Sequence, residues 1–412
     1  MGIQTPVRWR SDFDKFVVVS NCERRGWLRW VPSEGEDWNF FWASVHTVKQ
    51  IFNPDNGIRL GEHQIINHFP NHYELTRKDL MVKNLKRYKK EVEKEGLLAG
   101  SEVNTDWLEF LPMTFSLPAD FALFAEEFKR YPHSTWIMKP TSKSQGKGIF
   151  LVNKMSTVKK WIGVQTPTIR GTIEPYVISR YIDNPLLIGG RKFDLRLYVC
   201  VTSYRPLKAY FCNKGFARFC NSKYTAEMCE MDNLEVHLTN VAINKHGKTY
   251  NEKHGNKWPL ENLRLYMQGT HGHKASDQLF QSINMIIIHS LKAVQGVMVN
   301  DRHCFELYGY DIIIDDALKP WIIEVNASPS LSSTTESDRS LKCKVINDVM
   351  NLVIPDDFPE SRAWANKDPD QPFRNPPQTV GSFELLIDEE LEIANKREAR
   401  MTSMRSNAKK GF

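Results

Sequence analysis

Asp311 and Glu324 are flanked by apolar residues in two neighbouring segments, YGYDIIIDD (308–316) and KPWIIEVNASPS (319–330). A short polar turn separates these segments, so we expect them to form an antiparallel β-hairpin. In that hairpin Glu324 and Asn326 point to the same face of their strand, and Asp311 on the neighbouring strand can lie opposite them. Two carboxylates and an amide carbonyl are oxygen ligands suited to Mg²⁺, which takes few protein ligands and completes its shell with phosphates. Because an unpaired glutamate is costly to bury in an apolar strand, we favour a metal site over a chance acidic pair.

A cluster of charged residues opens the strand-like segment GGRKFDLRLYVCV (189–201). Lys192, Asp194 and Arg196 alternate with apolar residues and therefore share one face of the strand. A solvated strand edge would have the same composition. Because arginine binds planar anions through two parallel hydrogen bonds, a phosphate and carboxylate site explains the cluster better.

The segment KPTSKSQGKGIF (139–150) contains a glycine-rich turn between two strand-like stretches. Gly146 and Gly148 flank Lys147 in this turn. Such a turn lets backbone N–H groups approach phosphate oxygens while a lysine neutralises them. A glycine-rich hairpin loop has the same pattern, so this segment alone leaves both interpretations open.

Other nucleotide and metal sites are disfavoured. The sequence has no G-x-G-x-x-G motif, and AINKHGKT (242–249) has alanine where a P-loop requires its first glycine. His63, His68 and His72 have no cysteine or further ligand pattern nearby, so zinc is not expected. No convincing Ser/His/Asp or Cys/His set indicates a covalent protein nucleophile.

The elements that position these residues follow from apolar periodicity. From residue 136 onward, segments rich in Ile, Val and aromatic residues predict strands at 136–140, 148–152, 176–182, 195–201, 310–314 and 321–325. Helical spacing predicts a core-facing helix over 277–294. Nearer the N-terminus, residues 16–19 favour a short strand. Residues 77–90 favour a basic helix that is either solvated or faces an acidic partner.

The length of 412 residues suits two or three domains, and the net charge of +6 neither requires nor excludes an acidic partner. Seven scattered cysteines without a C-x-x-C pair argue against a disulfide framework and against a zinc ribbon. The first residues lack the apolar core of a signal peptide, and no apolar run approaches the roughly 18 residues of a membrane span. We therefore expect a soluble protein of the cytoplasm.

The composition changes near residue 355. Six of the 21 prolines fall between Pro355 and Pro377, which is typical of an extended linker. An acidic amphipathic piece (383–393) and a basic end follow it. We expect the compact body to end near residue 355 and the remainder to be a docking tail or partly disordered.

Several of these segments resemble the tubulin tyrosine ligase-like family of ATP-grasp ligases: WIMKP, QGKGIFLV, PLLIGGRKFDLRLYV, VHLTNVAI, YGYDIIID and WIIEVNASPSL. The resemblance covers about residues 38–351. Within the family the chain is most similar to the glutamate-adding branch, the tubulin polyglutamylases, also through NHFPNHYELTRKDLMVKN (67–84).

The resemblance implies an α/β (α+β) ATP-grasp fold with N-terminal, central and C-terminal domains, and with nucleotide between the central and C-terminal domains. We expect an N-terminal domain over 1–77, a central ATP-grasp domain over 78–182 and a C-terminal catalytic domain over 183–355. A Pro-rich linker and charged tail would occupy 356–412.

The resemblance also implies site residues. Nucleotide phosphates would meet Lys139, Gln145 and Gly146, and adenine would meet the hinge of Arg180, Tyr181, Ile182 and Asp183. Lys192, Phe193, Asp194, Thr239 and Asn240 would complete the ATP site. Asp311, Glu324 and Asn326 would hold two Mg²⁺ ions, Arg218 and Lys257 would bind free L-glutamate, and Gln145 would also meet the acceptor. Lys139, Lys192, Arg196 and Glu324 would be catalytic.

The implied activity is ATP-dependent tubulin polyglutamylation through an acylphosphate. The implied partners are the acidic C-terminal tails of tubulin, microtubules, free glutamate and accessory subunits, in the cytoplasm and cytoskeleton, with cilia or basal bodies as a family-level expectation. Two alternatives stay open: a glycine or tyrosine ligase of the same fold, and a non-catalytic microtubule-binding subunit. The basic residues lack the interleaved aromatics of a single-strand binder, so nucleic acid is not expected as a partner.

Overall fold

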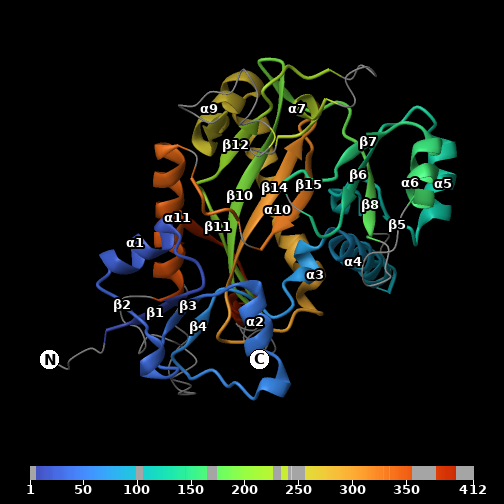
Figure 1. Cartoon of the computed structure of the whole chain (residues 1–412). Coiled ribbons are helices and arrows are strands. Elements are labelled where there is room, and N and C mark those ends of the chain that lie inside the picture. Colours follow the sequence, from blue (N-terminus) through green and yellow to red (C-terminus); the bar gives the residue numbers. More distant parts are fainter. Residues whose placement is uncertain are drawn as a thin grey trace, which may run out of the picture.

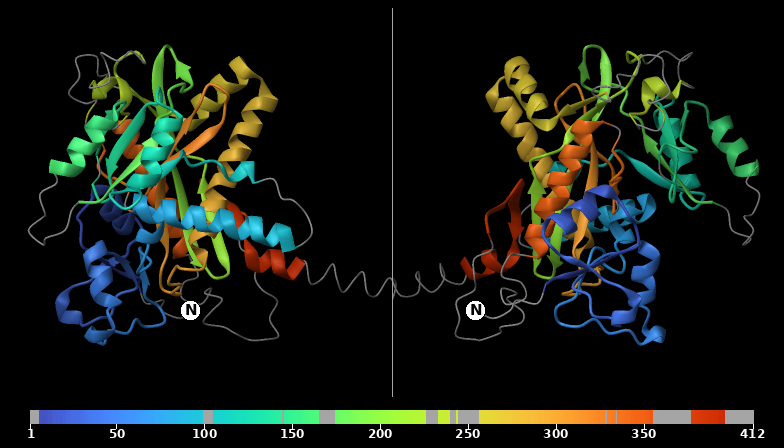
Figure 2. Two further views of the ribbon diagram at one scale, coloured as in Figure 1. Left: turned by 90° about the vertical axis from the view of Figure 1, so that its right-hand side faces the viewer. Right: turned by 60° about the vertical axis from the view of Figure 1, so that its left-hand side comes forward.

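A computed structural model of the chain describes residues 6–98, 105–143, 145–164, 174–225, 233–239, 243, 256–327, 329–333, 335–354 and 377–395 (Figures 1 and 2). Within these residues, strands form a parallel N-terminal sheet, an antiparallel central sheet and a large nine-stranded sheet. No helix among them is long and apolar enough to cross a bilayer.

The N-terminal sheet has the strand order β2-β1-β3-β4. Its elements are β1 (Arg8–Ser11), α1 (Phe16–Arg24), β2 (Leu28–Arg29), β3 (Phe40–Trp42), α2 (Val45–Ile51) and β4 (Ile65–Ile66), with 3-10 turns at Pro32–Glu34 and Pro54–Asn56. Phe40 stacks on Phe305 with 6.2 Å between the ring centroids. This contact packs the small sheet against the start of a long strand of the large sheet.

The strand predicted at residues 16–19 is wrong, because Phe16 begins helix α1. Val17, Val18, Asn21 and Cys22 are its buried residues. Their spacing is that of one helix face. The β-branched run at residues 17–19 favours a strand when it is considered without the residues that follow it. Asn21 donates a hydrogen bond to the backbone oxygen of Cys343 at 2.9 Å, so this face packs against helix α11 (Glu336–Val353).

The central sheet has the order β5-β8-β6-β7. Its strands are β5 (Thr114–Leu117), β6 (Trp136–Pro140), β7 (Phe150–Val152) and β8 (Tyr176–Arg180), and helices α5 (Phe121–Arg130) and α6 (Met155–Val164) lie along its outer side (Figure 1). The strands predicted near 136–140, 148–152 and 176–182 are thereby confirmed. The turn α3 (Tyr73–Thr76), the long helix α4 (Lys78–Leu98) and a 3-10 turn at Asp106–Leu108 connect the N-terminal sheet to this one.

The large sheet is built around the long strand β10 (Arg191–Tyr204), which pairs antiparallel with β11 (Leu207–Cys212), β12 (Phe216–Phe219) and β14 (Glu306–Ile314). Further strands are β9 (Leu187–Ile188), β13 (Lys257–Pro259), β15 (Pro320–Asn326), β16 (Thr379–Val380) and β17 (Phe383–Asp388). The remaining helices are α7 (Leu234–His237), α9 (Leu260–His271), α10 (His273–Gln295) and α11. The strands predicted at 195–201, 310–314 and 321–325 and the helix predicted at 277–294 are confirmed.

Alternation along β10 places two cores on its two faces. Leu195 and Leu197 belong to the core that contains Ile283 of α10, whereas Tyr198 and Cys200 belong to the core that contains Ile346 of α11. Because the strand is buried on both faces, it contains apolar residues almost continuously from Leu195 to Val201. The charged residues of the same strand are thereby restricted to its beginning.

The compact body extends past residue 355, contrary to the predicted boundary. Strand β17 pairs with β11 and adds to the large sheet. Phe383 is fully buried, and the backbone N–H of Ser382 donates to Asp348 Oδ2 of α11 at 2.8 Å. The strand falls in the acidic amphipathic piece (383–393), and its pairing with β11 is a long-range contact that no local sequence pattern indicates. Residues 355–376 and 396–412 lie outside the described residues.

Candidate functional site

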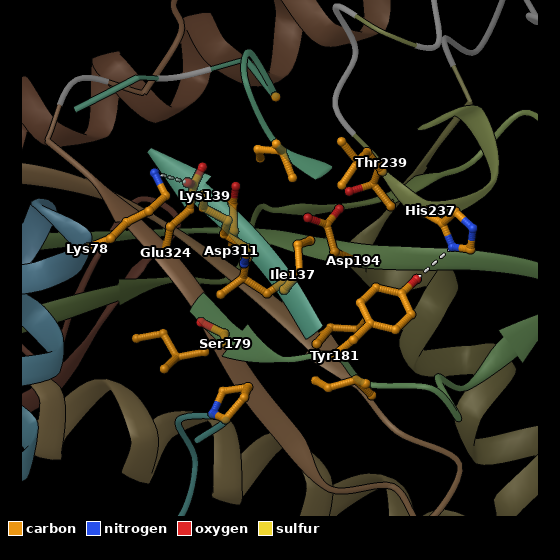
Figure 3. A pocket seen from close by; sticks show the side chains of 18 of the residues that line it. Lys78, Ile137, Lys139, Ser179, Tyr181, Asp194, His237, Thr239, Asp311 and Glu324 are labelled. Atoms are coloured by element: carbon orange, nitrogen blue, oxygen red, sulfur yellow. Dashed lines mark hydrogen bonds and ion pairs between the residues drawn. The ribbon is translucent and has the colours of Figure 1, made fainter. Parts of the chain in front are cut away.

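A pocket lies at the junction of the central sheet and the large sheet (Figure 3). Together with the open solvent at its mouth, it spans about 960 Å³. Strands β6, β8, β10, β12, β14 and β15 form its walls, together with the first residue of α4 and the segment that follows α7. The pocket therefore lies between the two sheets that the sequence predicted to enclose a nucleotide.

A row of charged side chains crosses the large sheet on one side of this pocket. The pairing register places Arg218 of β12 opposite Asp194 of β10, and Arg196 of β10 opposite Asp311 of β14. On the next strand, Glu324 of β15 lies opposite Asp311. The predicted hairpin and the facing of its two carboxylates are therefore confirmed.

Two arginines hold Asp311. Arg196 donates from Nε and Nη2 to the two carboxylate oxygens at 2.6 and 3.0 Å, and Arg218 Nη2 lies 2.8 Å from Asp311 Oδ2. Arg218 also donates to Asp194, from Nε to Oδ1 at 2.8 Å and from Nη2 to Oδ2. Two positive and two negative charges thus balance one another in a single buried network.

Burial and ion pairing act on these carboxyl groups in opposite directions. Burial alone would raise the pKa of Asp311, but Arg196 and Arg218 outweigh burial and lower that pKa to about 2. Burial raises the pKa of Asp194, and the Arg218 guanidinium opposes the rise. Asp311 is therefore ionised at neutral pH and can act as an anionic ligand.

Two lysines face the pocket from opposite sheets, Lys139 on β6 and Lys192 on β10. Burial lowers the pKa of each lysine to about 8. Lys192 Nζ donates to the Tyr181 hydroxyl at 2.7 Å, and that hydroxyl also bonds His237 Nδ1 at 2.9 Å (Figure 3). Because both lysines remain mostly protonated at pH 7, they provide positive charge that suits phosphate groups.

Apolar side chains line the remaining part of the pocket. They are Leu111, Ile137, Ile149, Ile182, Leu238, Ile313 and Ile322. A pocket lined by both apolar and cationic side chains suits a ligand with a flat ring and an anionic tail.

The acidic hairpin offers few ligands for a metal ion. Asn326 Nδ2 lies 3.4 Å from Glu324 Oε1 and 3.3 Å from the Gly309 carbonyl. The part of the chain that the structure describes has no cluster of three or more His, Cys, Asp or Glu arranged around a metal position. A set of two carboxylates and an amide fits Mg²⁺, which commonly binds one or two protein carboxylates and takes its other oxygens from water and phosphates.

The sequence of this pocket and its surroundings matches a known family. Residues 57–362 match the model of the Tubulin-tyrosine ligase family. The chain belongs to the tubulin-tyrosine ligase family. The ATP-grasp-like fold of this family agrees with the mixed α/β sheets described above, which confirms the predicted fold class.

Three similar proteins are named as probable tubulin polyglutamylases. The chain is 52% identical over 397 residues to "Probable alpha-tubulin polyglutamylase Ttll1" of Tetrahymena thermophila, covering 94% of both proteins. It is 44% identical over 376 residues to "Probable tubulin polyglutamylase TTLL9" of Bos taurus, covering 84% of this chain and 79% of that protein. It is 41% identical over 359 residues to "Probable tubulin polyglutamylase ttll-9" of Caenorhabditis elegans, covering 87% and 80%.

Most residues predicted for the site of this family member line one pocket. They are Lys139, Gln145, Gly146, Arg180, Tyr181, Ile182, Lys192, Asp194, Arg218, Thr239, Asp311 and Glu324. Arg196 and Asn326 are not among the lining residues, but they contact Asp311 and Glu324, which are. The structure therefore brings together residues that are widely separated in the sequence.

Three of the predicted residues lie elsewhere in the described part of the chain. Phe193 packs in the core with 5.3 Å between its ring centroid and that of Phe219, because it points to the face of β10 opposite that of its charged neighbours. Asp183 lines a neighbouring hollow, and Lys257 Nζ pairs with Asp338 at 3.0 Å. Asn240 lies outside the described residues.

Sequence reasoning missed Lys78, the first residue of α4. Its side chain enters the pocket, and Nζ lies 2.9 Å from Glu324 Oε2 (Figure 3). The only available signal was its place in a basic helix, where it looked like any solvated lysine. His237 was missed as well, although it directly precedes the segment predicted to line the nucleotide site.

A second missed group lies around Asp338 of α11. Lys257 and Lys342 both pair with its Oδ2, at 3.0 and 3.2 Å, and burial lowers the pKa of Lys342 to about 8. Two ammonium groups on one carboxylate leave an excess positive charge beside Arg218. That excess favours an anionic ligand near this end of the row.

Replacing Arg196 with Met would leave Asp311 with one arginine partner inside the protein. Because removing one partner of a buried ion pair typically costs about 3–5 kcal/mol, we expect the free energy of unfolding to fall by about 3 kcal/mol in a denaturant titration. Arg264→Met is the matched control, because Arg264 pairs with Asp277 at the surface, where such pairs contribute about 0–1 kcal/mol. Equally small losses in both variants would contradict a buried network.

Proposed function

We propose that this chain is an ATP-dependent tubulin polyglutamylase. It would join the α-amine of free glutamate to the γ-carboxylate of glutamate residues in the C-terminal tails of tubulin, through an isopeptide bond. The observation that carries the proposal is the 52% identity, over nearly the full length of both proteins, to the relative named "Probable alpha-tubulin polyglutamylase Ttll1". The charged pocket supports it, because the reaction brings together several anions.

In this proposal the pocket binds ATP between the two sheets. The adenine would lie among the apolar side chains of the pocket, beside Tyr181 and Ile182, and the phosphates would meet Lys139, Lys192 and the turn at Gln145 and Gly146. Thr239 and Asn240 would line the ribose and phosphate end. Asp183 would be the last residue of the hinge segment that contacts adenine. Support comes from the lining of the pocket, which contains both cationic and apolar side chains, as a nucleotide with its phosphates and its ring requires.

Mg²⁺ would be held by Asp311, Glu324 and Asn326. When bound, it would neutralise charge on the phosphates and on the oxygens between which the phosphoryl group moves. Lys78, Arg196 and Arg218 are cationic residues that contact the same carboxylates. Their positive charges would stabilise the charge that develops on the transferred group.

Free glutamate would bind at the other end of the row, where Arg218 and Lys257 lie on neighbouring strands. Two cationic side chains suit an amino acid with two carboxylates. Lys342 adds a third positive charge behind them. The acceptor side chain would enter beside Gln145, which reaches the phosphate end of the pocket.

The reaction proceeds in two steps. An oxygen of the acceptor γ-carboxylate attacks the γ-phosphorus of ATP, and ADP leaves, which gives an acylphosphate. The uncharged α-amine of free glutamate then attacks the acyl carbon, and phosphate leaves with the former carboxylate oxygen while the amine gives up a proton. The catalytic work of Lys139, Lys192, Arg196 and Glu324 is to position and neutralise these groups. No covalent protein nucleophile takes part.

The proposed partners are tubulin, microtubules and accessory subunits of a polyglutamylase complex, in the cytoplasm and on the microtubule cytoskeleton, including cilia or basal bodies. Helix α4 carries exposed lysines such as Lys83 and Lys90. Exposed positive charge steers acidic peptides toward a protein at low ionic strength. We therefore propose that α4 helps to attract the acidic tails of tubulin.

Two other functions remain as alternatives. A glycine or tyrosine ligase of the same family would need fewer cations around the side chain of its amino acid. The buried Arg218 and Lys342 and the partly buried Lys257 favour glutamate over both. A non-catalytic microtubule-binding subunit would not need a full set of phosphate and metal residues. The assembled pocket favours an active enzyme.

Incorporation of radiolabelled amino acids into purified tubulin tests the proposal. With ATP and Mg²⁺ we expect glutamate to be incorporated, and glycine and tyrosine not to be. Glu324→Gln should abolish incorporation, because it removes a charged ligand. Arg218→Ala should lower kcat/KM for glutamate by at least about 100-fold, since a charged hydrogen bond and its pairing are lost.

The outcomes separate the alternatives. Incorporation of glycine or tyrosine instead would contradict the proposed substrate, and equal use of glutamate by Arg218→Ala would contradict the role of that residue. If no label is incorporated by the chain alone, the assay is repeated with cell extract added. Incorporation that then depends on Glu324 would indicate missing partner subunits, and its continued absence would favour a binding function.

Proton uptake on nucleotide binding tests whether Lys139 and Lys192 meet the phosphates. Because nearby phosphate favours the ammonium form, binding should raise the lowered pKa of each lysine, so the protein should take up protons near pH 8. The affinity for nucleotide should accordingly fall as the pH rises above about 8.

The uptake is measured by calorimetric titration of a non-hydrolysable ATP analogue in two buffers of different ionisation enthalpy. Lys139→Met should reduce it, whereas Lys159→Met, at an exposed position on α6, should leave it unchanged. Binding without proton uptake in the unaltered protein would show that the phosphates lie elsewhere.

A further inference from the structure

Every carboxylate of the proposed metal site is already paired with a cation of this chain. Asp311 accepts hydrogen bonds from Arg196 and Arg218, and Glu324 pairs with Lys78 at 2.9 Å. These groups are largely buried, and the side chain of Asp311 is 3% exposed. In such surroundings a charge cannot lose its partner without a replacement, because an unpaired buried charge is strongly destabilising.

Of these cations, Arg218 is the one that bridges two carboxylates, Asp194 and Asp311. Its Nη2 lies 2.8 Å from Asp311 Oδ2, while its Nε donates to Asp194 Oδ1 at 2.8 Å. A divalent cation on Asp311 would lie next to this guanidinium, and like charges at such a distance repel. The two cations therefore compete for the same carboxylate oxygens.

The strand register places a cationic region beside the same guanidinium, on the side toward β13. Arg218 lies between Asp194 on β10 and Lys257 on β13, since each is its direct cross-strand partner. Lys257 and Lys342 share the single carboxylate oxygen Asp338 Oδ2, so the side toward β13 has more positive than negative charge. An incoming carboxylate on that side would balance the excess and offer Arg218 a new partner.

We propose that Arg218 exchanges partners, leaving Asp311 for the carboxylate of the incoming amino acid when a divalent cation binds at Asp311. This inference rests on the proposed function, because it assigns the amino acid to the side of Arg218 and Lys257. Binding of the cation and of the amino acid is then positively coupled, without direct contact between them. The coupling makes the site favour the amino acid only after the metal has bound.

Reciprocal binding measurements test this exchange without any turnover. The affinity of the full chain for Mn²⁺ is measured by electron paramagnetic resonance with and without L-glutamate, and the affinity for L-glutamate is measured by calorimetry with and without Mn²⁺. We expect each ligand to tighten the binding of the other by the same factor, within the range of about 5–150 that is typical of coupled sites. Independent binding of the two ligands, or no binding of glutamate in the presence of Mn²⁺, would overturn the proposal.

Two variants attribute the coupling to Arg218. Arg218→Gln should bind Mn²⁺ more tightly than the unaltered protein in the absence of glutamate, and glutamate should no longer change that affinity. Asp194→Asn releases the other anchor of Arg218, so it should bind glutamate more tightly than the unaltered protein when Mn²⁺ is absent. Tighter binding cannot result from unfolding, which keeps both measurements informative.

Arg264→Gln, at the surface pair with Asp277, is the control and should retain the full coupling. Coupling that persists in Arg218→Gln would overturn the proposal. Glycine and tyrosine are titrated alongside glutamate. Coupling with one of them in place of glutamate would support the exchange by Arg218 and contradict the proposed substrate. The experiment therefore distinguishes a failure of the exchange from a failure of the proposed function.

Discussion

The antiparallel register of β10 with β12 and β14 is the constraint on which the rest of the site depends. It sets Arg218 against Asp194 and Arg196 against Asp311, and the hairpin then adds Glu324. Because side chains alternate between the faces of a strand, a shift of β10 by one residue would turn Asp194 and Arg196 away from their partners on β12 and β14 and into the core beside α10. The long apolar part of β10, buried between α10 and α11, prevents such a shift.

The other parts of the molecule bring the remaining groups to this row. The central sheet supplies Lys139 and the turn at Gln145, and the start of α4 supplies Lys78. A buried contact helps to fix that start: Glu306 of β14 shares a hydrogen bond with His68 Nδ1 at 2.6 Å and accepts one from the backbone N–H of Phe69 at 3.0 Å. The same strand thus carries Asp311 and anchors the segment that leads to Lys78.

The local features of this fold could be predicted from the sequence, whereas the long-range ones could not. The facing of Asp311 and Glu324 follows from one short turn and from strand alternation, both of which are local. The pair of Lys78 with Glu324 joins segments far apart in the chain, and no periodicity links them. The assembled set of nucleotide residues came from the family resemblance rather than from spacing, since spacing alone left the glycine-rich turn open. The strand predicted at 16–19 and the boundary near 355 were wrong because local composition, β-branched residues in the one case and prolines in the other, does not show which faces tertiary packing buries.

Transfer of isotopic oxygen tests the central claim most directly, namely that this pocket activates a side-chain carboxylate as an acylphosphate. A glutamate-rich peptide with the sequence character of a tubulin tail is prepared with ¹⁸O in its acceptor carboxylates and incubated with the protein, ATP, Mg²⁺ and glutamate. The account predicts one ¹⁸O atom in the phosphate released for each bond formed, because the attacking carboxylate oxygen leaves with the phosphoryl group. Phosphate free of ¹⁸O, at normal bond formation, would contradict it.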